Sequence, residues 1–275
     1  MRKTYHMAKL SAYDFGIIRS PGPGLGNLLL PIARALIGAE RAKGVFIFPT
    51  IRQLKVGTFL RREPDKRVYG DELRGRGAIE WVRWIFSHFR PSVAEGCYVE
   101  YSHPVTVRYE GLGRFFHDLS GHEKLIKSWI ELNSNTKNRT RPEGYIALHI
   151  RLGDFAESGS ASEGFSVKTS FEWYLRALKL VLEKSNTSQT KNIVIFTDSD
   201  HERIRAGLGI SNIIFDNSSS AMEAIIKMSQ AEYLVTSRST FSMWAAFLGE
   251  STCIWHAGLR VDYYYPISER DIVIE

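Results

Sequence analysis

Three short polar motifs in the second half of the sequence carry side chains that bind anions or transfer protons. Each follows a short apolar run: His149 to Asp154 (HIRLGD), Thr197 to Asp200 (TDSD) and Ser237 to Ser242 (SRSTFS). Arginine offers a planar pair of N–H donors that matches phosphate oxygens, and a helix that starts with hydroxyl residues presents backbone N–H groups to an anion. This combination is typical of a site for a phosphate-containing ligand.

The first motif places a cation and an anion at the end of an apolar run. Arg151 is expected to hold a phosphate group, with His149 beside it. Asp154, three residues further on, would either orient the guanidinium or receive a proton. The alternative interpretation is a structural pair, in which Arg151 and Asp154 only close a loop.

The second and third motifs each allow a ligand role and a structural one. Asp198 is suited to bind ribose hydroxyls or a base N–H, and with Asp200 it also matches an Asp-x-Asp metal site. Asp200 alone would equally cap the following helix. Ser239, Thr240 and Ser242 open another helix and would form an anion site there. The alternative is that Ser239 is a simple N-cap.

A glycine-rich turn, GPGLGN from Gly22 to Asn27, precedes an expected helix near the start of the chain. As a dinucleotide fingerprint it would bring backbone close to a pyrophosphate, and Arg52 would then favour NADP. Its spacing is GxGxG rather than GxGxxG. The alternative is a tight turn that packs Gly24, Gly26 and Asn27 against a substrate.

Apolar runs and helical patterns alternate along the second half and predict a parallel sheet. Strands are expected at 145–150, 192–197, 212–216, 232–236 and 252–256, and helices at 169–184, about 200–207, 219–231 and 240–249. The carboxyl ends of parallel strands share one edge, so Arg151, Asp198 and Ser239 should meet there.

The first half opens in the same way, with a strand at 15–20, a helix at 27–44 and a strand at 45–50. Pro31 is expected in the first turn of that helix. The polar stretch 133–144 is the best linker. The fold class is therefore α/β, with a basic N-terminal lobe over 1–140 and a C-terminal Rossmann-like lobe over 141–275.

Charge is distributed unevenly between these halves. Residues 1–140 hold 23 Lys/Arg and 13 Asp/Glu, a balance of +10, whereas residues 141–275 hold 13 and 17, a balance of −4. A basic half suggests contact with an anionic surface. Trp81, Trp84, Ile85 and Phe89, at helical spacing, would then lie on an anionic membrane. The alternative is core packing of these aromatic residues.

Composition excludes several classes of protein. The longest apolar runs fall well short of the roughly 20 residues that span a bilayer, and the basic N-terminus lacks the apolar region of a secretory signal. The two cysteines, Cys97 and Cys253, form no CxxC pattern, which argues against a disulfide framework or a structural zinc site. A cytoplasmic location, possibly peripheral to the membrane, is the prediction.

Five segments occur in an order that resembles a known family. They are GLGNLLLPIARAL (from Gly24), HIRLGD (from His149), TSFEWYLRAL (from Thr169), FTDSD (from Phe196) and MSQAEYLVTSRSTFSMWAAFLG (from Met228). Together they resemble the α-1,2-fucosyltransferases of glycosyltransferase family 11. The resemblance covers most of 141–250 and residues 24–36, whereas 50–140 matches poorly.

The resemblance implies a two-lobed GT-B fold with the active site in the cleft between the lobes. The lobe over 1–140 would then face the acceptor, and the lobe over 141–275 would bind the nucleotide sugar. The resemblance also implies inverting transfer of L-fucose from GDP-fucose to a glycan hydroxyl, with no metal or other cofactor. By this likeness Arg151 grips the diphosphate and Asp198 lies near the nucleoside. The residues that would hold phosphate, ribose or sugar are His149, Ser239, Thr240 and Ser242 in one lobe and Gly24, Gly26 and Asn27 in the other.

Four positions depart from the family pattern: Leu152 replaces the second Arg of HxRRGD, Leu28 a Gln, Arg238 an Asn and Met243 a Trp. Arg238 is a possible substitute for the cation lost at Leu152. These departures keep the nucleoside diphosphate but weaken the expectation that the sugar is fucose.

Acceptor activation needs a carboxylate or histidine beside the attacking hydroxyl. Asp154 and Glu157 lie in the polar stretch DFAESGSASEGFS, and Glu157 is the predicted general base, against the alternative of an ordinary solvated glutamate. Three other functions stay open: transfer from another nucleotide sugar, an NAD(P)-dependent oxidoreductase built on the glycine-rich turn, and a basic nucleic-acid-binding module. The last lacks any nucleic-acid-binding motif, so no nucleic-acid partner is predicted.

Overall fold

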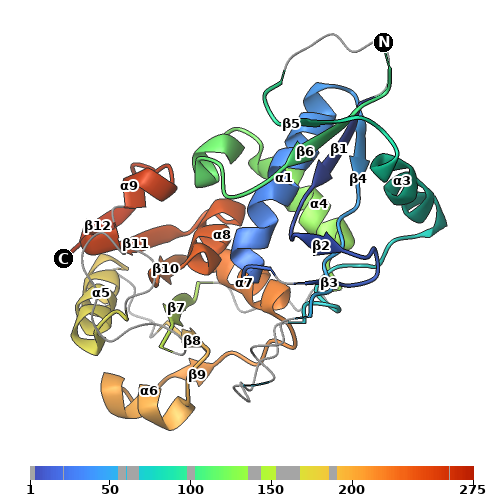
Figure 1. The fold of residues 1–275 in the computed structure, drawn as a ribbon. Helices are drawn as coiled ribbons and strands as arrows, with labels where there is room; N and C mark the ends of the chain where they lie inside the picture. The colour runs from blue at the N-terminus through green and yellow to red at the C-terminus, as the bar shows by residue number, and fades with distance from the viewer. Residues whose placement is uncertain are drawn as a thin grey trace. The chain divides into compact units, whose positions relative to one another are not determined.

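The computed structural model describes residues 4–20, 22–54, 60, 68–97, 103–135, 144–152, 168–185, 191–259 and 261–275. The chain divides into two compact units, residues 1–136 (unit 1) and 137–275 (unit 2). Each contains a parallel sheet with helices packed on it (Figure 1). The predicted α/β class with two Rossmann-like lobes is therefore confirmed.

Unit 2 is built on a six-stranded sheet in the order β12-β11-β10-β7-β8-β9, with every neighbouring pair parallel. The strands are β7 (Ile146–Ile150), β8 (Ile193–Thr197), β9 (Ile214–Phe215), β10 (Tyr233–Val235), β11 (Thr252–His256) and β12 (Ile272–Ile274). The chain runs outward from β7 through β8 to β9, then returns to β10 beside β7 and continues the other way. Strand order thus reverses between β7 and β10.

Helices connect these strands where the apolar periodicity predicts them. They are α5 (Phe171–Lys184), α6 (His201–Leu208), α7 (Ala221–Ser229), α8 (Thr240–Leu248) and the short α9 (Val261–Tyr264). A side-chain oxygen accepts a backbone N–H at the start of each of the first four, from the N-caps Ser170, Asp200, Ser220 and Ser239. Local capping signals therefore set where these helices begin.

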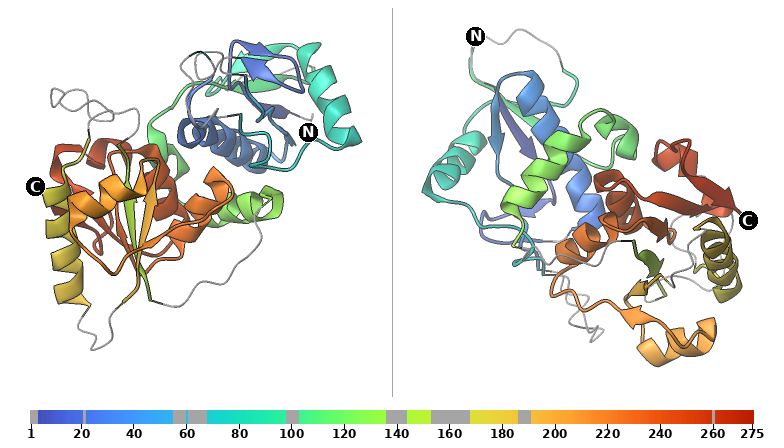
Figure 2. Two further views of the ribbon diagram at one scale, coloured as in Figure 1. Left: turned by 90° about the horizontal axis from the view of Figure 1, so that it is seen from below. Right: turned by 180° about the vertical axis from the view of Figure 1, so that it is seen from behind.

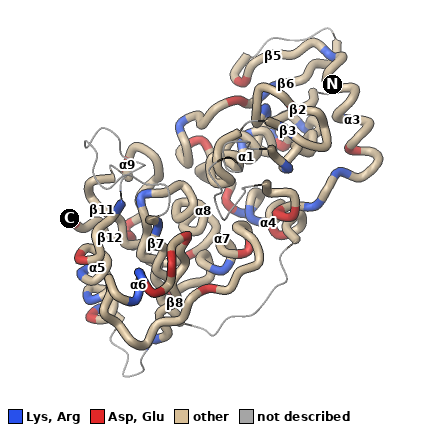
Figure 3. Tube along the Cα trace, turned by 60° about the horizontal axis from the view of Figure 1, so that its bottom comes forward, with Lys and Arg blue, Asp and Glu red and all other residues tan. Residues whose placement is uncertain are grey.

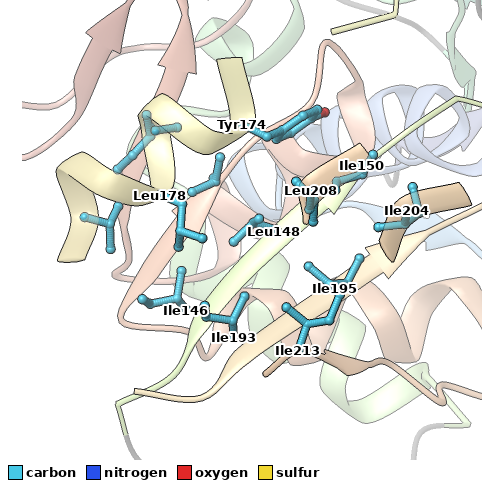
Figure 4. Packing of buried hydrophobic residues seen from close by; sticks show 14 of the residues in the cluster. Ile146, Leu148, Ile150, Tyr174, Leu178, Ile193, Ile195, Ile204, Leu208 and Ile213 are labelled. Atoms are coloured by element: carbon cyan, nitrogen blue, oxygen red, sulfur yellow. The ribbon is translucent and has the colours of Figure 1, made fainter. Parts of the chain in front are cut away.

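The core of unit 2 lies between the sheet and α5 and α6 (Figure 4). Ile146, Leu148 and Ile150 alternate along β7 and pack with Leu178 of α5 and Leu208 of α6, all of them buried. Strands buried on both faces read as continuous apolar runs, which is why β7 was recognisable in the sequence.

Unit 1 has a four-stranded parallel sheet in the order β4-β1-β6-β5. Its strands are β1 (Tyr5–Ala8), β4 (Val45–Ile47), β5 (Ser92–Ala94) and β6 (Thr106–Tyr109), and its helices are α1 (Leu25–Arg41), α3 (Ala78–His88), the 3-10 helix η1 (Phe115–Leu119) and α4 (Glu123–Asn133). Helix α1 packs on β1 and β6 through an almost wholly buried apolar side.

The strand predicted at 15–20 is wrong as a member of this sheet. Residues 13–20 form a small antiparallel hairpin, β2 (Tyr13–Asp14) with β3 (Arg19–Ser20), and the central strand β1 lies earlier. Gly16, with φ +82°, lies in the hairpin turn. A left-handed backbone breaks an extended run, so the apolar residues of FGIIRS cannot continue as one strand.

Helix α1 begins earlier than predicted, at Leu25, with Gly24 as N-cap. Pro31 consequently lies inside the helix rather than in its first turn, which corrects the prediction. A proline there removes one backbone hydrogen bond, and burial of the surrounding apolar side chains compensates for it. Gly26 and Asn27 therefore belong to the first turn of the helix.

Candidate functional site

The carboxyl ends of β7 and β10 mark the point where strand order reverses in unit 2. In open α/β sheets, ligands bind beyond the carboxyl ends of the strands at such a point. Arg151 follows β7, and Ser237 to Thr240 follow β10. Asp198 follows β8 on the other side of β7. The three motifs predicted from sequence therefore surround the reversal point.

Strand register places Arg151 and Asp198 next to each other at this edge. Ile150 of β7 is opposite Thr197 of β8, so Arg151 and Asp198 are each one residue beyond the pairing. On the other side of β7, the pairing with β10 ends where Leu148 is opposite Val235, and Arg238 follows three residues after Val235. Asp198, Arg151 and Arg238 thus follow three neighbouring strands, with Arg151 next to the reversal point.

Arg151 pairs with Asp198 at this edge of the sheet. Its Nε lies 3.5 Å from Asp198 Oδ2, and the two side chains are 25% and 39% exposed. Asp198 Oδ1 also accepts a hydrogen bond from the Leu152 N–H, at 3.1 Å. The carboxylate therefore ties the end of β8 to the end of β7 and orients a guanidinium that is still partly accessible to a ligand.

His149 does not face solvent at the candidate site but lies in the interior next to it. It is buried, and its Nδ1 lies 2.5 Å from Ser242 Oγ and 2.8 Å from Ser237 Oγ. Ser242 Oγ in turn accepts a hydrogen bond from the Ser237 N–H, at 3.1 Å. Burial, with the neighbouring Arg151 cation, lowers the pKa of His149 to about 3, so the ring is neutral. This network joins β7 to the start of α8.

At the start of α8 the structure shows the predicted N-cap, and the anion site stays a prediction. Ser239 is the N-cap, and its hydroxyl accepts the Phe241 N–H at 3.2 Å, as the structural alternative requires. Ser242 is fully buried, so it positions the helix start and does not contact a ligand directly. Thr240, half-buried, is the first residue of α8. An anion site at this turn would therefore rely on backbone N–H groups.

Arg238, which the sequence suggested only as a substitute for the cation lost at Leu152, contacts His256 in the structure. Its Nη2 lies 3.2 and 3.3 Å from the ring nitrogens of His256, and the Gly258 N–H donates to His256 Nδ1 at 3.0 Å. Burial, together with the neighbouring cations Arg238 and Arg176, lowers the pKa of His256 to about 4. The neutral ring, stacked on Trp173, therefore accepts hydrogen bonds and orients a second cation at this edge.

Asp200 serves as a helix cap. Its Oδ1 accepts the Arg203 N–H at 3.0 Å, which is the structural alternative foreseen for it. Within the described part of the chain, no group of three or more His, Cys, Asp or Glu is arranged to hold a metal ion. Asp154 and Glu157 lie outside the described residues.

The glycine-rich turn belongs to unit 1, apart from the other predicted residues. The Gly24 carbonyl accepts the N–H groups of Asn27 and Leu28, both at 3.1 Å, and Gly26 is buried. The turn follows the two-residue antiparallel strand β3 and not a strand of the parallel sheet. This placement differs from a dinucleotide fingerprint, in which the glycines follow a central parallel strand.

The parallel sheet of unit 2, with helices between its strands and a strand-order reversal at the candidate site, is Rossmann-like. The model of glycosyl transferase family 11 matches residues 114–260, just over half of the chain. The chain therefore belongs to glycosyl transferase family 11, a family of fucosyltransferases, and the prediction of a glycosyltransferase is confirmed. No curated protein matches the sequence.

Solved glycosyltransferase structures resemble the whole chain only distantly. Fucosyltransferase NodZ from Bradyrhizobium is 12% identical, with a TM-score of 0.47 over 90% of this chain and 94% of that one. POFUT1 in complex with GDP is 13% identical, with a TM-score of 0.45 over 91% and 96%. E. coli heptosyltransferase WaaC is 11% identical, with a TM-score of 0.45 over 99% and 93%. Likeness at this level says nothing about individual residues.

Proposed function

We propose that this chain transfers L-fucose from GDP-fucose to a glycan hydroxyl, with inversion at the sugar carbon. The observation that carries the proposal is the row of Asp198, Arg151 and Arg238 at the strand-order reversal, beside the start of α8. Two guanidinium groups and helical N–H groups would face the diphosphate. Asp198 would lie toward the nucleoside.

The departing diphosphate is where these residues would act. As the bond between the sugar carbon and the phosphate oxygen breaks, negative charge builds on the diphosphate, and preorganised cations lower the energy of that state. Asp198 and His256 hold the two guanidinium groups in place before the donor arrives. The acceptor oxygen forms the new bond as its proton passes to a base, for which Glu157 stays the prediction.

Three of the four departures from the family pattern lie in the core. Leu28 and Met243 are fully buried, and Leu152 is 4% exposed. They alter packing rather than the surface that meets a donor. Arg238 is then the departure that bears on the donor, and it adds a cation where Leu152 removes one. The proposed donor sugar therefore stays fucose, with another nucleotide sugar as the alternative.

The role of unit 1 at the donor site and the location of the protein in the cell also belong to the proposal. Approach of Gly24, Gly26 and Asn27 to the sugar from unit 1, and a donor site between the units, stay predictions. No helix within the described ranges is long and apolar enough to cross a bilayer. A cytoplasmic location and contact with an anionic membrane also stay predictions.

A thermal-shift panel of GDP, UDP, CDP, ADP and NADPH tests the nucleotide. GDP is expected to raise Tm most, because a ligand at 100 times its Kd stabilises the folded state by about 2.7 kcal/mol. Hydrolysis or transfer assays with GDP-fucose and a glycan mixture would then detect released GDP. A shift with NADPH and none with GDP would reject the proposal in favour of an oxidoreductase.

Replacement of Arg238 by the family's asparagine tests the second cation. Arg238→Asn is expected to raise KM for the donor about tenfold, because a charged hydrogen bond contributes about 1.5 kcal/mol or more. Arg176→Ala is the matched control, since Arg176 also faces His256 but is held at the chain end by the Glu275 carbonyl. Equal KM values in the two variants would give Arg238 a purely structural role.

A further inference from the structure

Helix α3 of unit 1 presents an apolar face outward. Five large apolar side chains are 45–81% exposed: Ile79, Val82, Ile85, Phe86 and, at the C-cap, Phe89. At about 100° per residue they occupy an arc of roughly 120° on one side of the helix. Soluble proteins seldom leave so continuous an apolar stripe uncovered, so this one indicates a binding surface.

The tryptophans of α3 face the other way, which corrects the predicted membrane face. Trp81 and Trp84 are half-buried beside Gly16, where an added Cβ would come within 2.7–2.9 Å of their rings. Arg76 lies over both rings, at 5.3 and 5.0 Å from their centroids, and donates a hydrogen bond to the Gly16 carbonyl. Packing against the β2–β3 turn, the alternative foreseen for these aromatic residues, is therefore what the tryptophans do.

That packing brings a second exposed apolar segment next to α3. Phe15 and Ile17, on either side of Gly16, are 64% and 67% exposed. The hairpin and α3 lie side by side in Figure 2 (left), although they are separated by more than fifty residues of sequence. We call the set Phe15, Ile17, Ile79, Val82, Ile85, Phe86 and Phe89 the α3 face.

The charge balance of unit 1 indicates which kind of partner the α3 face binds. Unit 1 holds 21 Lys/Arg and 13 Asp/Glu, a balance of +8, and unit 2 holds 15 and 17, a balance of −2. Arg83 is exposed at the border of the face, whereas the acid Asp14 accepts hydrogen bonds from the Gly16 N–H and the Thr50 hydroxyl. Figure 3 marks where the basic and acidic residues lie along the chain. A second copy of the chain would bring two strongly basic units together. An anionic surface complements the positive charge balance of unit 1 better than a second copy of the chain does.

We propose that the α3 face docks unit 1 on an anionic lipid bilayer. At about 1.5 Å per residue, the eleven residues of α3 span roughly 16 Å, about half of a bilayer core, so the helix lies along the surface. The apolar side chains enter the boundary between headgroups and acyl chains, and the basic residues of unit 1 meet lipid phosphates. The inference does not depend on the nucleotide that unit 2 binds.

Co-sedimentation of the full chain with vesicles tests the docking surface. Binding is expected to vesicles of phosphatidylcholine mixed with phosphatidylserine and to weaken at high salt and with phosphatidylcholine alone. Phe86→Ser/Phe89→Ser is expected to weaken binding at least about tenfold, because two exposed phenylalanines no longer enter the apolar phase. Leu182→Ser/Ile214→Ser, which removes two similarly exposed apolar side chains from unit 2, is the matched control and should bind normally.

Two further measurements distinguish docking on lipid from misfolding of the variant and from self-association of the chain. The Tm shift with GDP should be the same in the phenylalanine variant and in wild type, which shows that the variant is folded and that donor binding is independent of the α3 face. Sedimentation velocity measures self-association. Vesicle binding that is absent in wild type, or equal in both double variants, overturns the proposal, as does a dimer that the phenylalanine variant dissociates without any binding to lipid.

Discussion

Arg151→Ala is expected to lower kcat/KM for sugar transfer by about 100- to 1000-fold, the usual effect of removing one preorganised donor to developing negative charge. The side chain is the central cation of the row at the strand-order reversal, and Asp198 holds its Nε at 3.5 Å. Arg151→Lys keeps the charge but loses the planar fork, so it should recover only part of the activity. Initial rates with GDP-fucose measure both variants.

The Arg151→Ala variant should lose activity without unfolding. Asp198 is 39% exposed, so its carboxylate stays hydrated when the guanidinium is removed. Circular dichroism and Tm should therefore remain close to wild type. Arg203→Ala, at an exposed position of α6, is the control. Turnover of Arg151→Ala within a fewfold of this control would exclude a role in transfer.

Lys227→Met is expected to destabilise unit 2 by about 3–5 kcal/mol, because removing one partner leaves buried charge uncompensated. The Lys227 ammonium lies 2.8 Å from Glu223 and 3.5 Å from Asp216, and all three side chains are at most 8% exposed. Urea unfolding measures the change. The control is Lys179→Met in the exposed Lys179–Glu183 pair of α5, which should change stability by less than about 1 kcal/mol. A small effect at Lys227 would mean that water reaches the cluster.

In the wild-type protein, low pH should reduce the stability that the buried cluster of Lys227, Glu223 and Asp216 provides. Burial by itself raises the pKa of Glu223, but hydrogen bonds from Lys227 and Ser219 outweigh it and lower the pKa to about 2. A carboxyl whose pKa is lower in the folded state stabilises the fold above its unfolded pKa, so this contribution is lost as pH falls from about 4.5 to about 2. Lys227→Met should lose less stability over that window, and an equal loss would contradict the assignment.

The sequence was most informative where structure is local. Strands β7, β8 and β11 are short apolar runs, and the helices between them start at Ser170, Asp200, Ser220 and Ser239, which are capping residues whose signal lies within a few residues of chain. The same reasoning failed in unit 1. The strand β1 is four residues long and stays extended because β4 and β6 pair with it, whereas FGIIRS, more apolar, turns at Gly16 into a hairpin.

From its sequence alone this protein could be predicted to be an α/β glycosyltransferase, with Arg151, Asp198 and Ser239 at the ends of parallel strands. Only the tertiary structure decided that Asp198 pairs with Arg151, that His256 contacts Arg238, and that Ser242 is buried. It also decided that Phe86 and Phe89 face outward while Trp81 and Trp84 do not. The reason is physical: caps and periodicity act between neighbours in the chain, whereas strand register and burial depend on segments that are distant in sequence.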